Sequence, residues 1–116
     1  MKLNILERIV AIQVIEEFRT HQANFITFKT MNSLRDKLFV NEEEVKKYEL
    51  RIEDNNYKWN DLGFTEQVEI DITEAEKALL VKQLITMDKE NKLVNDHVSL
   101  VEKCIPNPEE VLSKVE

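Results

Sequence analysis

The chain has 116 residues, with 16 Lys or Arg against 23 Asp or Glu, so its formal net charge is −7. This length favours one domain, and the acidic balance excludes a strongly basic nucleic-acid binder. All apolar runs fall short of the ~20 residues that span a membrane, and a single cysteine excludes an internal disulfide framework. Because the amino terminus has no secretory-signal pattern, we expect a cytoplasmic protein without a membrane partner.

Two helices are predicted in the first forty residues. Asn4 and Glu7 have the spacing of a capping box, and the apolar residues that follow recur at helical intervals, which predicts a helix over 5–15. The polar stretch 16–24 predicts a loop, and a second helix is expected over 27–39. The apolar residues of this second helix, spaced by three and four, are Met31, Leu34 and Leu38.

The strongest local signal lies just after residue 40. Asn41 and Glu44 have capping-box spacing, and Val40 and Val45 occupy the positions of a hydrophobic staple. Glutamates at the first three helical positions complement the positive end of the helix dipole. The pattern therefore predicts a short third helix that begins at Glu42.

From residue 48 the period of the apolar residues changes from 3.6 to 2, which indicates strands. The first strand is predicted over 48–53, and after an Asp-Asn-Asn turn the second runs through Tyr57 and Trp59. The third is predicted over 68–72, after a turn that contains Gly63. Clean alternation favours an antiparallel meander with one wet face, so we expect both aromatic side chains to fill the core beneath it.

Two further helices are predicted in the last third of the chain. Thr73 and Glu76 form another capping-box pattern, which opens the longest helix, expected over 74–90. A last helix is expected around 96–104. The prolines at 106 and 108 then end it, because proline disfavours the helical conformation of the residue before it.

The predicted order of three helices, three strands and two helices defines an α+β class. We expect N-terminal helices, a three-stranded antiparallel β-meander and two C-terminal helices in one domain over residues 1–105. Residues 106–116 are expected to form an acidic C-terminal tail that is disordered or frayed. The order of helix, helix, short helix and hairpin is also that of a winged helix-turn-helix. In that arrangement three glutamates would face DNA phosphates, so we expect no direct nucleic-acid binding.

The residue inventory lacks the patterns of catalytic, cofactor-binding and metal sites. One glycine cannot build a phosphate-binding loop, and the two histidines, His21 and His97, are 76 positions apart. We expect an exposed His21, a helix-end His97 and a buried or half-buried Cys104. The sequence therefore predicts no catalytic residues, no cofactor and no metal, and a protein that is not an enzyme.

The negative charge is concentrated in the middle of the chain. Residues 1–40 carry a net +2, residues 41–76 a net −8 and residues 77–116 a net −1. A solvated strand face with helix-capping carboxylates explains this concentration, and so does a surface that binds a partner. On the second interpretation, the partner-binding acidic face of the meander consists of Glu49, Glu53, Glu69 and Asp71.

Several short segments, spread over most of the chain, carry a family resemblance. They are Met1-Lys2-Leu3-Asn4-Ile5-Leu6-Glu7-Arg8-Ile9, Ser33-Leu34-Arg35, Glu42-Glu43-Glu44, Trp59-Asn60 and His97-Val98-Ser99-Leu100. In these segments the chain resembles small uncharacterised proteins encoded in bacteriophage and prophage genomes. Those proteins have a glycine between the first two helices, where this chain has the longer stretch from Glu16 to Asn24. The resemblance implies a viral origin and an accessory role, and it supplies no functional residues.

Three functions follow as hypotheses. The first is a non-enzymatic bacteriophage or prophage accessory protein that acts through a protein partner in the host cytoplasm. The second is an inhibitor of a host nucleic-acid-binding defence system, in which the acidic face occupies a basic groove. The third is a winged-helix transcription regulator. Homodimerisation stays open, because the two last helices carry an apolar surplus.

Overall fold

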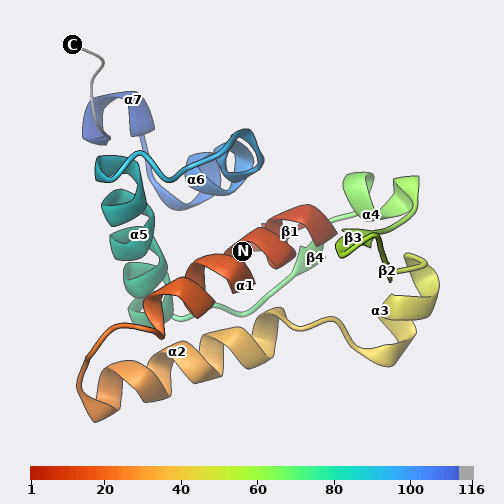
Figure 1. The fold of residues 1–116 in the computed structure, drawn as a ribbon, viewed down its shortest axis with the longest axis horizontal. Coiled ribbons are helices and arrows are strands. Elements are labelled where there is room, and N and C mark those ends of the chain that lie inside the picture. The colour runs from red at the N-terminus through yellow and green to blue at the C-terminus, as the bar shows by residue number, and fades with distance from the viewer. Residues whose placement is uncertain (113–116) are drawn as a thin grey trace.

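A computed structural model of the chain describes residues 1–112 as a mixed structure of helices and small antiparallel sheets (Figure 1). In chain order its elements are β1 (Lys2–Leu3), α1 (Ile5–Phe18), α2 (Phe25–Leu38), α3 (Glu42–Lys47), β2 (Arg51–Glu53), β3 (Asn56–Lys58), α4 (Asp61–Thr65), β4 (Val68–Glu69), α5 (Glu74–Lys89), the 3₁₀ helix η1 (Asn95–His97), α6 (Val98–Cys104) and α7 (Pro108–Val111). Within residues 1–112, none of the helices is long and apolar enough to cross a membrane.

The central element is α1, which packs against α2, α5 and α6 (Figure 1). Its side chains Val10, Ala11 and Val14 are buried, and they join Leu34 of α2 and Leu84 of α5 in one apolar cluster. Burial of such side chains is worth roughly 1.5–3 kcal/mol each relative to exposure. The core is therefore built from helices, with α1 as its axis.

The helix starts follow the predicted capping signals. Both hydrogen bonds of a capping box are present at the starts of α1, α3 and α5, as the sequence predicts. At the start of α2, Asn24 accepts from the backbone N–H of Thr27, so this helix begins at Phe25, two residues before the predicted start. Helix α1 continues to Phe18, which shortens the predicted loop. The long helix α5 lies where the sequence places it, and η1 followed by α6 occupies the range of the last predicted helix.

The predicted three-stranded meander is wrong. Strands β2 and β3 form an isolated hairpin, whereas β4 pairs with β1 at the amino terminus, with Val68 opposite Leu3. Gly63 lies in helix α4. Asn60 caps this helix, because its side-chain oxygen accepts from the backbone N–H of Gly63 at 3.2 Å. Alternation of apolar residues fixes which side of a strand is buried, but it does not choose the partner strand. The short α4 therefore separates two sheets that the sequence pattern merges.

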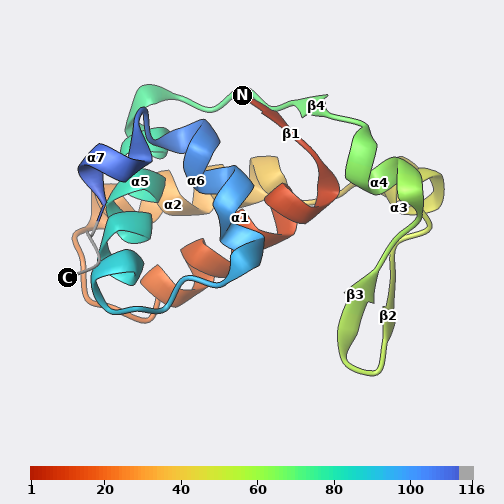
Figure 2. The same cartoon turned by 90° about the horizontal axis from the view of Figure 1, so that it is seen from above.

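The β2–β3 hairpin projects from the helical body (Figure 2). All six of its strand residues are exposed, so the predicted core position of Tyr57, which is 50% exposed, is wrong. The predicted turn is confirmed, with Asp54 and Asn55 both at positive φ, as a two-residue hairpin turn requires. Trp59 is half-buried, and its ring lies 5.2 Å from that of Phe64 between centroids.

The region after α6 is partly helical. Residues 108–111 form α7, and Leu112 packs against the apolar core, so the expected disorder is wrong for this part of the tail. The rest of the predicted tail, residues 113–116, lies outside the described residues. Proline at the first position of α7 suits a helix start, because the amide it lacks would have no partner within the helix.

Candidate functional site

An apolar hollow of about 320 Å³ lies between α1 and the segment that carries α3 and the hairpin. From α1 it is lined by Ile9, Ile12, Gln13 and Glu16. From the facing segment it is lined by Phe39, Val40, Val45, Leu50 and Tyr57. Apart from one glutamine and one glutamate, the walls are apolar or aromatic, which is the composition of a site that buries an apolar partner.

A second hollow, of about 390 Å³, meets the first at Tyr57. It is lined by Leu6 of α1, by Trp59 and Phe64, and by the charged residues Lys58 and Asp96. Tyr57 lines both hollows. We call the two hollows together the α1–hairpin groove. Along α1 the groove extends from Leu6 to Glu16, about 15 Å at ~1.5 Å per residue.

The groove exists because one flank of α1 is only partly covered. The apolar residues of α1 lie on every side of the helix, a pattern typical of a helix surrounded by other elements. Helices α2, α5, α6, η1 and α4 all contact α1. Leu6, Ile9 and Ile12 stay half-buried beside the groove, and Leu6 and Ile12 also pack against the core. The fold therefore leaves a stripe of aliphatic side chains open on its central helix.

Arg8 ties the facing wall of the groove to α1. Its guanidinium, in a side chain only 2% exposed, donates to the backbone oxygens of Leu38 at 3.1 Å and Phe39 at 2.7 Å. It also donates to the Glu44 carboxylate at 2.6 Å and 3.3 Å. These bonds fix the end of α2 and the start of α3, and so they position Phe39 and Val45 in the wall.

The Glu44 carboxyl is held in its charged form by this network. Burial alone would raise its pKa, but the hydrogen bond from Arg8, the backbone N–H of Asn41 and the charges of Arg8 and Lys47 together bring the pKa below its ordinary value. Glu44 also completes the capping box of α3. One carboxylate therefore both starts the helix and connects it to α1.

Hydrogen bonds between the residues on either side of the hairpin close its base. The hydroxyl of the buried Tyr48 donates to Glu66 at 2.8 Å, and Lys47 forms an ion pair with the same carboxylate. The backbone N–H of Asn60 donates to the carbonyl of Tyr48 at 2.8 Å, and its side-chain amide donates to the carbonyl of Lys47 at 3.0 Å. Burial, with the hydrogen bond to Glu66, raises the pKa of Tyr48. The hairpin is thus anchored at its base.

The four carboxylates predicted to form one acidic sheet face belong to two different places. Glu53 lies in β2 and Glu49 just before it, whereas Glu69 lies in β4 and Asp71 just after it. Glu49 accepts from the Asn60 amide at 3.1 Å, Glu53 pairs with Arg51 at 3.0 Å, and Glu69 lies 3.4 Å from the terminal ammonium group. The shared face depended on the meander, so the structure does not bring these residues together on one sheet.

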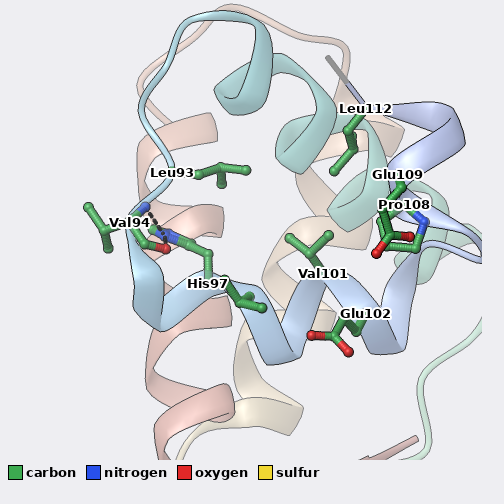
Figure 3. A pocket seen from close by; sticks show the side chains of 9 residues that line it. Leu93, Val94, His97, Val101, Glu102, Pro108, Glu109 and Leu112 are labelled. Atoms are coloured by element: carbon green, nitrogen blue, oxygen red, sulfur yellow. Dashed lines mark hydrogen bonds between the residues drawn. The ribbon is translucent and has the colours of Figure 1, made fainter. Parts of the chain in front are cut away.

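A separate pocket of about 290 Å³ lies between α6 and α7 (Figure 3). Its floor is apolar, and Glu102 and Glu109 approach it from the two helices. His97, 8% exposed, accepts the backbone N–H of Val94 at its Nδ1 atom at 2.9 Å. His97 lies at the junction of η1 and α6, as its predicted helix-end position requires, and here it closes the η1 turn.

The remaining residues considered for chemistry lie where the sequence predicts them. His21 is exposed and Cys104 is buried. Burial raises the pKa of the Cys104 thiol to about 11, which keeps it protonated and unreactive at neutral pH. Among residues 1–112, no group of three or more His, Cys, Asp or Glu side chains is placed to hold a metal ion.

Comparisons of the chain with protein-family models, with curated proteins and with solved structures found no match. The site is therefore defined by the geometry of the chain itself.

The groove could have been suspected from the sequence in one respect. Apolar residues lie on every side of α1, so any side that its neighbours cover incompletely, here that of Leu6, Ile9 and Ile12, presents apolar side chains. The facing wall had no such signal, because it combines residues from the α2–α3 connection, α3 and a hairpin whose docking depends on tertiary contacts.

Proposed function

We propose that this protein is a non-enzymatic accessory protein that acts by binding a protein partner in the α1–hairpin groove. The observation that carries the proposal is the half-buried apolar flank of the central helix, faced by a second apolar wall with exposed side chains. Exposed apolar patches rimmed by polar residues mark protein-interaction sites and binding grooves.

The side chains of the facing wall support this proposal. Tyr57 and Phe39 are 50% and 45% exposed, and Ile52, directly opposite Tyr57 in the hairpin, is also exposed. Cross-strand neighbours share a face of a hairpin, so these apolar side chains present a common surface. Covering them would contribute about 25 cal/mol for each Å² removed from water.

The anchoring of the walls also favours binding. Arg8 holds the α2–α3 connection, and the bonds around Tyr48 hold the base of the hairpin. A surface that is ordered before the partner arrives loses less conformational entropy on binding, which favours affinity.

The test is affinity capture from a lysate of the source organism, with identification of the bound proteins. The wild-type protein is compared with Tyr57→Asp in the groove and with Phe25→Asp, a matched aromatic change at a residue that is 73% exposed on α2. We expect one partner that the wild type and Phe25→Asp both retain and Tyr57→Asp loses. A partner retained by all three proteins places the interaction outside the groove, and measurable turnover abolished by carboxylate changes contradicts the non-enzymatic role.

A bacteriophage or prophage origin is a further part of the proposal. Its only support is that short segments such as Trp59-Asn60 resemble small uncharacterised proteins of bacteriophage and prophage genomes. The acidic-inhibitor hypothesis has one supporting observation, the net −8 of residues 41–76, which include the facing wall. The winged-helix hypothesis is supported only by the order of α1, α2, α3 and the hairpin along the chain.

A further inference from the structure

We infer that the occupant of the α1–hairpin groove is an amphipathic α-helix of the partner, apolar on one side and bearing Lys or Arg along its edges. This inference rests on the proposed function and names the chemistry of the partner at the same site.

The first argument is the shape of the groove. Its inner wall is a helix, and helices pack on one another by placing ridges of side chains into grooves at ~8–10 Å between axes. The hollow beside Leu6 and the one beside Ile12 are separated by six residues of α1, about 9 Å at ~1.5 Å per residue. Two side chains seven residues apart on a partner helix are separated by about 10 Å, so they can fill one hollow each.

The second argument concerns the hairpin. Tyr57 lines both hollows, so β3 borders the groove. An added β-strand pairs with the edge of a sheet through backbone hydrogen bonds, and it does not lie against the face. Tyr57 and its cross-strand neighbour Ile52, both exposed, give the hairpin an apolar side that a helix can contact through side chains.

The third argument is charge. Residues 39–66, which form the facing wall, contain eight acidic and four basic residues. Glu44, Glu53 and Glu66 are paired with Arg8, Arg51 and Lys47. The other five acids of this segment form no ion pair within residues 1–112; they are Glu42, Glu43, Glu49, Asp54 and Asp61. Of the bases in this segment, Lys46 and Lys58 also form no ion pair within residues 1–112, so five unpaired carboxylates stand against two unpaired ammonium groups. In the hollows, Asp96 is likewise unpaired within these residues, whereas Glu16 is already paired with Arg35, which also lies over the Phe39 ring.

The net negative charge of the segment that carries the facing wall is complementary to a basic partner. Opposite charges at the rim speed association and reject acidic competitors, while the apolar centre supplies most of the binding energy. The resulting partner surface has apolar anchors in one stripe and basic residues on both sides of it.

The experiment is a selection of displayed random 16-residue peptides on the wild-type protein, with removal of those that also bind Tyr57→Asp. We expect enriched sequences with apolar residues at positions i, i+3 or i+4, and i+7, and with an excess of Lys and Arg. A synthetic copy of the best peptide should bind at least tenfold more weakly after a central residue is changed to proline, which interrupts a helix.

A matched pair of double variants tests the charge argument. Glu49→Lys with Glu53→Lys changes the hairpin, and Glu69→Lys with Asp71→Lys makes the same charge change at the β1–β4 sheet. We expect the hairpin pair to weaken binding of the selected peptide about tenfold and the other pair to change it less than twofold. Equal weakening by both pairs would show that only the net charge of the protein matters, and it overturns the basic-edge assignment.

Three results overturn the inference as a whole: enriched peptides with a period of two, enriched peptides that are acidic, or no peptide that distinguishes the wild type from Tyr57→Asp. If the lysate partner is nevertheless lost in Tyr57→Asp, the proposed function stands and only the helical occupant fails. Light scattering adds a further check, because a dimer that Tyr57→Asp dissociates would assign the groove to a second copy of this chain.

Discussion

Arg8 offers the most direct test of how the facing wall is held. In Arg8→Met the side chain keeps much of its apolar length but loses the donors to Leu38, Phe39 and Glu44. The Glu44 carboxylate, 17% exposed, then lies beside α1 without its cationic partner. Two backbone oxygens at the end of α2 lose their Arg8 donors as well.

The size of the effect follows from this geometry. Removing one partner of a buried ion pair costs ~3–5 kcal/mol, and we expect about 3 kcal/mol because Glu44 retains the backbone N–H of Asn41 and some contact with water. For 116 residues the entropy of unfolding near the midpoint is about 0.24 kcal/mol per kelvin, so the midpoint should fall by about 12 °C. Urea unfolding followed by circular dichroism measures the free energy directly.

A double-mutant cycle separates the ion pair from general packing. Glu44→Gln removes the negative charge that needs a partner. Arg8→Met should therefore destabilise the Glu44→Gln protein less than it destabilises the wild type, with a coupling free energy of at least about 1 kcal/mol. A loss below about 1 kcal/mol in Arg8→Met, or strict additivity in the cycle, would refute the reasoning. The selected peptide should also bind Arg8→Met more weakly, because the wall is displaced.

The other predictions concern single sites. Cys104 should resist iodoacetamide at pH 8 in the folded protein and react in urea, because burial raises its pKa to about 11; rapid labelling of the folded protein would contradict this. The pKa of Glu44 is lower in the folded state, so its contribution to stability is present above its ordinary value of about 4.5 and is lost as the pH falls through the folded-state pKa. Urea midpoints across this range should therefore fall less steeply with acid in Glu44→Gln than in the wild type. In Gly63→Ala the new Cβ would lie 2.5 Å from Cδ1 of Trp59, so we expect a loss of about 1–2 kcal/mol and a shifted emission of this only tryptophan; unchanged emission would mean that the ring does not need to move. Tyr57→Asp should change the stability by less than about 0.5 kcal/mol, because this side chain is exposed, and a larger loss in urea unfolding would disqualify it as a binding probe.

The helices were the part of the fold most open to prediction. A capping box is a local device, since the two residues that form it are only three positions apart. Asn41 with Glu44 and Thr73 with Glu76 therefore identified their helix starts from sequence alone. The sequence pattern predicts the start of α2 two residues too late, because Asn24 caps this helix without a glutamate or glutamine three residues later.

The strands show where local patterns stop being informative. The residues of β4 alternate as predicted, but their partner is β1, more than sixty residues earlier in the chain. Such pairings are decided by the packing of the intervening helices, and alternation carries no information on them. For the same reason the four carboxylates predicted to share one face lie at two different sheets, and Tyr57, expected in the core, is exposed.

The sequence by itself determined the acidic charge, the helix starts and the hairpin turn, because each depends on composition or on residues within one or two turns of the chain. Only the tertiary structure decided that the hairpin projects beside α1 and that a flank of this apolar helix stays open between them. That arrangement depends on Arg8 reaching the end of α2 and the start of α3, contacts across thirty or more residues that no local pattern encodes. The acidic stretch of residues 41–76 includes most of the segment that carries the facing wall of this groove.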